Sequence, residues 1–259
     1  MGDPMRMKVP LLSGYVAALS LASVAVAAAE PVAVRLAEAP DMRALVLRSL
    51  DGKTLAQGDV TLTVSNEQVT SRVVFHFSDG SSHDETTLFS QSGVFRLLSY
   101  RLVQSGPAFP RRLDMTLDAR TGSISVRSRE GNSAEEVDAE TLKLSADLAN
   151  GMMVPVLKNL GAANVPASAS WVAATPSPRH VKLAISMAGT EPSRADSTRR
   201  LIHYVVKVEI GGLAGRLAPL VGKQPPDTHV WIEDGPAPTF VKSEGPLYVG
   251  GPVWRIEVP

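Results

Sequence analysis

The stretch SRVVFHFSDGSSHDE, residues 71–85, decides the fold of this chain. Apolar and polar residues alternate up to Phe77, and this period of two is typical of a β-strand, because successive side chains point to opposite faces. Asp79-Gly80 then supplies the positive φ angles that a tight hairpin turn needs. The stretch therefore predicts two antiparallel strands joined by this turn.

A loop of two or four residues would pair His76 with His83, and it would place both on one face with Glu85 and Arg72. The Cβ atoms of directly opposed residues lie about 5 Å apart. Two imidazoles and a carboxylate are ligands for a divalent transition metal. The hairpin therefore predicts a metal site at His76, His83 and Glu85, and the alternative is an exposed histidine pair that binds nothing.

The same pairing places Asp84 opposite Phe75, on the drier face of the hairpin. A lone buried carboxylate is costly and often functional. The alternative is that Asp84 stays wet near the turn or pairs with an arginine.

The pattern continues outward from the hairpin. Residues 94–103 are apolar on both faces, which is typical of a central strand covered on both sides. Residues 113–127 alternate as a second hairpin. A helix is expected over 147–160, with Ser145 or Asp147 as its cap and a kink at Pro155, and a second over 211–222. Further strands are expected over residues 44–50, 60–64, 135–144, 181–187, 202–210, 229–233, 239–242 and 253–258.

About a dozen short strands with two short helices predict a mainly β fold, a curved antiparallel sheet or open barrel with one or two helices packed on it. Hairpins in place of strand–helix alternation argue against a doubly wound sheet. We expect residues 30–259 to form a single β-rich domain.

Residues 1–29 have the features of a cleavable signal peptide: Arg6 and Lys8, an apolar run, and Ala27-Ala28-Ala29 before Glu30. The alternative is a retained membrane anchor. We expect a protein of the periplasm or the exterior that meets the membrane only transiently, through this segment.

Composition excludes several functions. Lysine plus arginine and aspartate plus glutamate each number 26, so the chain lacks the basic excess typical of nucleic-acid binders, and no nucleic-acid partner is expected. Its zero cysteines exclude a cysteine nucleophile. The glycines near Lys223 miss the spacing of phosphate and dinucleotide loops, so no cofactor is expected.

Several motifs resemble a family of uncharacterised exported bacterial proteins. The resembling segments are residues 79–87, 89–91, 147–151 and 243–248. The resemblance implies a small exported β-rich protein, and it supplies no activity and no site residues.

Three functions remain open, and the first is a non-enzymatic carrier of an apolar, lipid-like ligand inside the curved sheet. The second is a metal-dependent hydrolase that uses the histidine cluster. The third is an envelope assembly or scaffold protein that binds a partner through a sheet edge. The residues expected to contact an apolar ligand are Phe95, Leu97, Met152, Trp171 and Trp231.

Overall fold

The computed structural model describes residues 30–193, 198–209 and 225–259, and within these ranges fourteen strands form one sheet. Each strand runs antiparallel to its neighbours. The strands are β1 (Asp41–Ser49), β2 (Thr54–Ser65), β3 (Gln68–Phe77), β4 (Ser82–Ser90), β5 (Arg96–Ser105), β6 (Arg112–Asp118), β7 (Ser123–Arg129), β8 (Glu136–Thr141), β9 (Ala167–Ala173), β10 (Arg179–Pro192), β11 (Arg200–Glu209), β12 (Thr228–Glu233), β13 (Thr239–Pro246) and β14 (Val253–Glu257).

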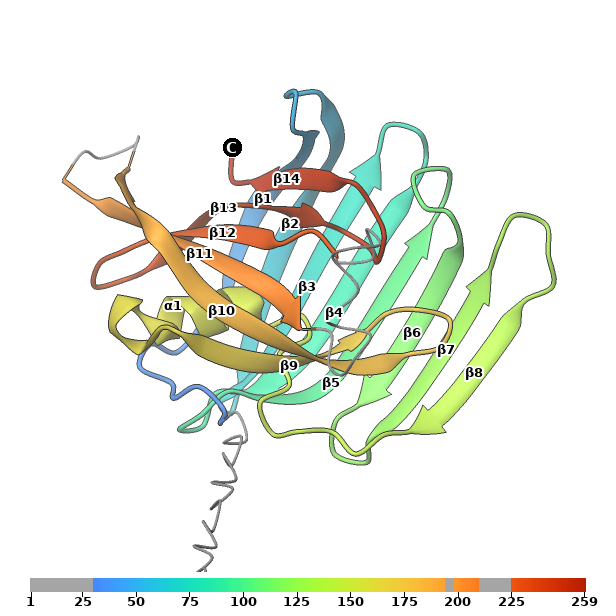
Figure 1. The fold of residues 1–259 in the computed structure, drawn as a ribbon, viewed down its shortest axis with the longest axis horizontal. Helices are drawn as coiled ribbons and strands as arrows, with labels where there is room; N and C mark the ends of the chain where they lie inside the picture. Colours follow the sequence, from blue (N-terminus) through green and yellow to red (C-terminus); the bar gives the residue numbers. More distant parts are fainter. Residues whose placement is uncertain (1–29, 194–197, 210–224) are drawn as a thin grey trace, which may run out of the picture.

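The chain builds the sheet in two halves. Strands β1 to β8 follow one another, helix α1 (Met153–Leu160) and a 3-10 turn (Ala162–Asn164) come next, and β9 to β14 return until β14 pairs with β1. Figure 1 shows β9 to β12 crossing in front of β3 to β6. The end strands β8 and β9 do not pair with each other, so the sheet is bent but not closed. The predicted mainly β, open antiparallel fold is confirmed.

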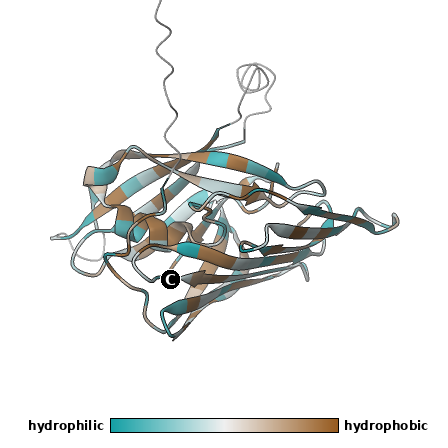
Figure 2. Cartoon of the chain, turned by 90° about the horizontal axis from the view of Figure 1, so that it is seen from below, coloured by the Kyte–Doolittle hydropathy of each residue, from teal (hydrophilic) through white to brown (hydrophobic). Residues whose placement is uncertain are grey.

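Two apolar clusters fill the space inside the bend. The larger one joins α1, through Val156 and Leu157, to residues of both halves such as Met115 and Ile185. Figure 2 shows hydrophobic residues on α1 and on the strands around it. The smaller cluster contains Leu45, Leu47, Ala56, Phe75, Phe77 and Phe109. Because every strand alternates, the opposite face of the sheet carries most of the charged side chains.

The β3–β4 hairpin has a loop of three residues, Ser78 to Gly80, closed by a hydrogen bond from Phe77 N to Ser81 O of 2.9 Å. Gly80 has a φ of +84°, as expected for the last residue of a three-residue loop. An odd loop shifts the pairing by one residue, so Phe75 faces His83 and His76 faces Ser82. The predicted register is therefore wrong, and a slip of one residue moves every side chain of one strand to the other face.

Strand β5 is dry on one face only, in contrast to the prediction for residues 94–103. Leu97 pairs with Phe89, but Ser99 pairs with Leu88, so Leu98 is an extra residue in a β-bulge. The bulge returns Tyr100 and Leu102 to the same buried face as Leu97. The prediction applied a strict period of two across this bulge, and it therefore placed these residues on both faces.

Helix α1 begins at Met153, six residues later than Asp147, where the prediction placed its start. Gly151, with a φ of +65°, precedes it, and neither Ser145 nor Asp147 caps it. Pro155 lies in the first turn, where a backbone N–H has no partner within the helix, so the predicted kink is absent. The remainder of the predicted helix, residues 147–152, consists of turns and an isolated bridge between Leu148 and Ser170.

Two expectations lie outside the described residues: the signal peptide over 1–29 and the helix over 211–222. Among the described helices, none combines the length and the apolar character needed to span a membrane.

Candidate functional site

The structure does not assemble the predicted metal site. His83 is buried, at 2% exposure, on the inner face of β4, whereas His76 is exposed on the outer face of β3. Only His83 and Glu85 meet, with 3.5 Å between Nε2 and Oε2. Within the described residues, no group of three or more histidine, cysteine, aspartate or glutamate side chains is arranged to hold a metal ion. The physical reason is the three-residue loop, which shifts the pairing by one residue and so places His76 and His83 on opposite faces.

Asp84 also lies on the face of the hairpin opposite to the predicted one. It is opposite Val74, on the outer surface, and it binds Arg72 through two hydrogen bonds of 2.7 and 3.1 Å. The hydrogen bond from Arg72 is the main cause that lowers the pKa of Asp84. The alternative interpretation, an arginine partner, is therefore confirmed.

The inner face of β4 and β5 carries a polar group that we call the interior seam. It consists of His83, Glu85, Thr87, Tyr100 and Gln104. Gln104 Nε2 lies 3.0 Å from His83 Nδ1 and donates at 3.0 Å to the carbonyl oxygen of Leu247, in the loop after β13. The seam therefore connects the two halves of the sheet.

The far end of the seam packs against the segment before α1. Tyr100 is 4% exposed, and burial, followed by the charge and the hydrogen bond of Glu85, raises its pKa well above the usual value. Gly151 lies so close that a Cβ atom there would overlap Thr87 Oγ1 and lie 2.9 Å from Glu85 Oε1. Only glycine fits this position.

The chemistry open to the seam is limited by access. The Glu85 side chain is 20% exposed, but the imidazole of His83 is 2% exposed. A substrate can therefore reach the carboxylate but not the ring, and the arrangement does not favour a hydrolase. Sequence reasoning identified His83 and Glu85 but missed Thr87, Tyr100 and Gln104. A signal for them was available. Every second residue of β4 from His83 onward lies on the same face, so the observed register identifies Thr87 and the residues paired with it.

Four of the five residues predicted to contact an apolar ligand belong to the larger apolar cluster or pack against it. Phe95, Leu97 and Met152 are buried in the larger apolar cluster, and Trp171 packs against it. Phe95 and Met152 line a cavity of about 10 Å³, which has room for about one water molecule. A second hollow, of about 490 Å³, is a wide depression over β2 and β3 that includes His76.

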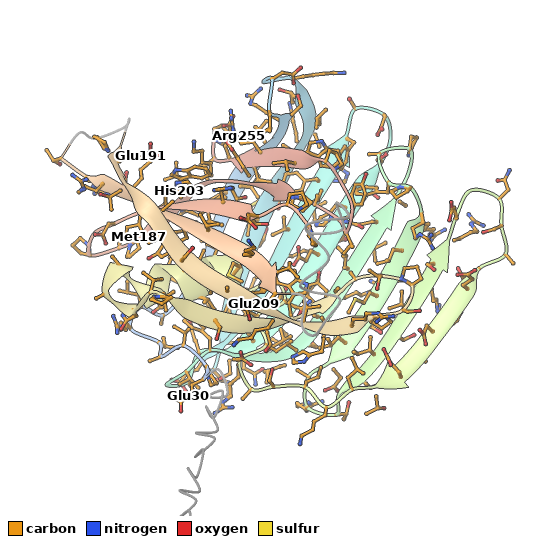
Figure 3. The ribbon with its side chains drawn as sticks, viewed as in Figure 1. Glu30, Met187, Glu191, His203, Glu209 and Arg255 are labelled. Atoms are coloured by element: carbon orange, nitrogen blue, oxygen red, sulfur yellow. The ribbon has the colours of Figure 1, made fainter. Side chains whose placement is uncertain are left out.

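Trp231 is not part of this group. Val230 and Ile232 face the larger cluster, so Trp231 between them lies on the opposite face of β12, where it is 8% exposed. His203, labelled in Figure 3, stacks on Trp231 with 4.1 Å between ring centroids. Lys242 Nζ lies 4.0 Å from the Trp231 centroid. Trp231 is therefore separate from the cluster that holds Phe95, because neighbouring residues of a strand face opposite sides, and its expected contact with a ligand stays a prediction.

No protein-family model and no curated protein matches this chain. A solved structure, described as a beta-barrel-like protein of domain of unknown function DUF1849 from Brucella abortus, aligns with a TM-score of 0.42 at 10% identity. The alignment covers 84% of this chain and 94% of that chain. The likeness is to a β-rich protein of unknown function, and it assigns no ligand, partner or activity to this chain.

The two end strands of the sheet, β9 and β8, differ in whether other residues cover their outer edges. The edge of β9 is covered by residues 147–150: Ala149 N donates to Ser170 O at 2.8 Å, and Asn150 binds the backbone N and O of Val172 at 2.8 and 2.9 Å. The Asn150 amide acts as one more peptide group of a neighbouring strand. No described residue covers the edge of β8 in this way, and its Val137 is 61% exposed.

Strand β8 is also acidic. Its pairing with β7 places Glu136, Asp138 and Glu140 on the face that β7 fills with the buried residues Ser128, Val126 and Ile124. None of these three carboxylates forms an ion pair with another described residue. Inward-pointing charges at a sheet end discourage pairing with a like strand.

Proposed function

We propose that this chain is a non-enzymatic binding protein that pairs strand β8 with an extended segment of a partner protein. The observation that carries this proposal is the difference between the two sheet ends, since residues 147–150 cover the edge of β9 and no described residue pairs with the edge of β8. A terminal strand leaves alternate N–H and C=O groups unpaired, and an added strand satisfies them.

The charge of β8 determines which partner it accepts. Directly opposed like charges destabilise a strand pair, so a second copy of the acidic β8 is disfavoured. A segment with lysine or arginine at alternate positions places its cations opposite Glu136, Asp138 and Glu140. The acidic edge therefore selects a basic extended segment and rejects self-association.

The proposal includes the location of the protein. The segment over residues 1–29 has the features of a signal peptide, so we propose that the mature protein acts outside the cytoplasm. The partner is then an envelope or exported protein.

Site-specific photo-crosslinking in the source cells tests this function. A photo-reactive amino acid replaces Val137 on β8, and the matched control replaces Met42, which is 71% exposed but lies on β1 in the middle of the sheet. We expect a discrete adduct from position 137 that is absent from position 42. The adduct should be lost with Asp138→Lys and retained with Glu67→Lys, an equal charge change at an exposed turn. Equal adducts from both positions, or none at 137, contradict the proposal.

A carrier of an apolar, lipid-like ligand is the second candidate. The observation in its favour is that Phe95, Leu97, Met152 and Trp171 pack in the same apolar cluster as α1. A cavity of about 10 Å³ holds no such ligand, so α1 would have to move away from the sheet for the ligand to enter. Native mass spectrometry of the protein purified from its source tests the carrier: a retained lipid supports it, and a ligand-free chain contradicts it.

A further inference from the structure

Asp147 is a buried carboxylate with one oxygen unused. Its side chain belongs to a residue that is 7% exposed, and Oδ2 accepts a hydrogen bond of 3.1 Å from Ser170 Oγ. Oδ1 is buried and has no hydrogen-bond partner among the described residues. Removing a charged oxygen from water without giving it a partner carries a large free-energy cost. Oδ1 of Asp147 therefore requires a hydrogen-bond donor, and a cationic donor stabilises it most.

The start of the described chain lines the cavity beside Asp147. Asp147 and Glu30 both line the hollow of about 10 Å³, together with Pro31, Phe95 and Ser168. A space of this size admits a group no larger than a water molecule. An ammonium group has that size.

Backbone hydrogen bonds hold both walls of this cavity. On one side, Phe95 N donates to Val32 O at 2.9 Å, and Val34 N donates to Gly93 O at 2.9 Å. On the other side, Ser170 N donates to Asp147 O at 3.2 Å. Glu30 therefore comes directly before a segment that is hydrogen-bonded to the sheet, and it lines the same hollow as Asp147.

We propose that Asp147 is the binding site for the α-ammonium group of Glu30, which is created when the signal peptide is cleaved after Ala29. Hydrolysis of the Ala29–Glu30 peptide bond adds one water, leaves the carboxylate on Ala29 and frees the amine of Glu30, which takes up a proton at neutral pH. The uncharged amide of the precursor, with one N–H, becomes a cation with three donors. This inference rests on the exported location proposed above and is independent of the partner of β8.

The pair has a consequence for folding. It ties the N-terminal arm, the segment before α1 and the edge of β9 at one point, and it exists only in the processed chain. The precursor retains an unpaired buried carboxylate, so it is less stable than the mature protein. A less stable precursor suits a chain that must cross a membrane before it folds.

Stability measurements on four purified chains test the proposal. One chain begins at Glu30, one carries the additional residue Ala29 in front of it, and each is made with Asp147 intact and with Asp147→Asn. We expect the extra residue to lower the urea midpoint when Asp147 is present and to have no effect in the Asp147→Asn chain. Such coupling requires that the amine and the carboxylate interact. Equal midpoints for the first two chains mean that the cavity holds water only, and they overturn the proposal.

The rate of chemical labelling of the amine is a second measurement, and a general loss of stability does not change it. We expect an acylating reagent to modify the α-amine of Glu30 about tenfold more slowly in the wild type than in the Asp147→Asn chain, since the pair holds the amine in its protonated form. The control is Asp79→Asn, at an exposed turn, which should leave the rate unchanged. Equal rates in the wild type and in the Asp147→Asn chain overturn the proposal, as does a native protein whose first residue, by mass spectrometry, is not Glu30.

Discussion

Gln104 donates from one nitrogen to both His83 and the backbone of Leu247. Nε2 lies 3.0 Å from His83 Nδ1 and 3.0 Å from the Leu247 carbonyl oxygen, so the two protons of the amide are both engaged. His83 Nδ1 must therefore accept, and the proton of the neutral ring lies on Nε2, toward Glu85. His83 also contacts Phe75 of the smaller apolar cluster, with 6.1 Å between ring centroids. The interior seam thus connects β4, β5 and the loop after β13.

Replacing Gln104 by leucine should destabilise the protein by about 1–3 kcal/mol, because it leaves His83 Nδ1 and the Leu247 carbonyl buried without a partner. The measurement is the free energy of unfolding in urea. The control is Gln57→Leu, an equal change on the exposed side of β2, for which we expect a change within about 0.5 kcal/mol. Similar values for both variants would show that the seam contributes nothing beyond an exposed glutamine.

Gly151→Ala should be more damaging than an ordinary glycine substitution. Gly151 has a φ of +65°, and its new Cβ would overlap Thr87 Oγ1. Gly52→Ala separates the two causes, because Gly52 has a φ of +94° with nothing within 4 Å. We expect about 1 kcal/mol for Gly52→Ala, from backbone strain alone, and at least 1–3 kcal/mol more, as an order of magnitude, for Gly151→Ala. Equal losses would mean that the segment before α1 moves freely away from β4.

Alternation along the chain was sufficient to predict the architecture. Hairpins with Asp-Gly or similar turns predict neighbouring antiparallel strands, and the described sheet consists of such neighbours, with one exception. The exception is the pairing of β1 with β14, where Leu47 faces Ile256. No local pattern predicts that contact, because it joins residues far apart in the sequence that pack in the smaller apolar cluster.

The candidate site was harder to predict, because it depends on single-residue shifts. One residue in the β3–β4 loop decides whether His76 or Phe75 faces His83. One extra residue, Leu98, decides whether Tyr100 faces the interior. A period of two carries no information about such insertions, although Gly80 as the third loop residue was a usable signal. The role of Gly151 comes from a tertiary contact that its neighbours in the sequence do not reveal.

The Arg72–Asp84 pair should contribute little to stability, although its geometry is good. The side chains of Arg72 and Asp84 are 57% and 36% exposed, and solvent screens such pairs. We expect Asp84→Asn to lower the free energy of unfolding by no more than about 1 kcal/mol. The double variant with Arg72→Gln should show whether the two effects are coupled. A loss several times larger would restore the view that Asp84 has a role beyond this pair.

His203 should make the stability of the protein depend on pH. Its Nε2 lies 2.8 Å from His229 Nδ1, and burial, followed by the charge of His229, lowers its pKa below the usual value. Among the other charged groups that act on it, Lys242 lowers this pKa, whereas Glu191 and Glu244 raise it. The unfolded chain then binds a proton more readily than the folded chain, so acid favours unfolding.

The contribution of His203 is present above the pKa of an unfolded histidine, about 6.5, and is lost as the pH falls through the lower pKa of the folded state. We expect the urea midpoint to fall between about pH 7.5 and about pH 5 in the wild type, and to fall less in His203→Gln. His76→Gln, on the outer face of β3, is the matched control and should retain the full slope. If His203→Gln retains it as well, the ring pair does not restrict protonation, and the acid sensitivity of the fold arises elsewhere.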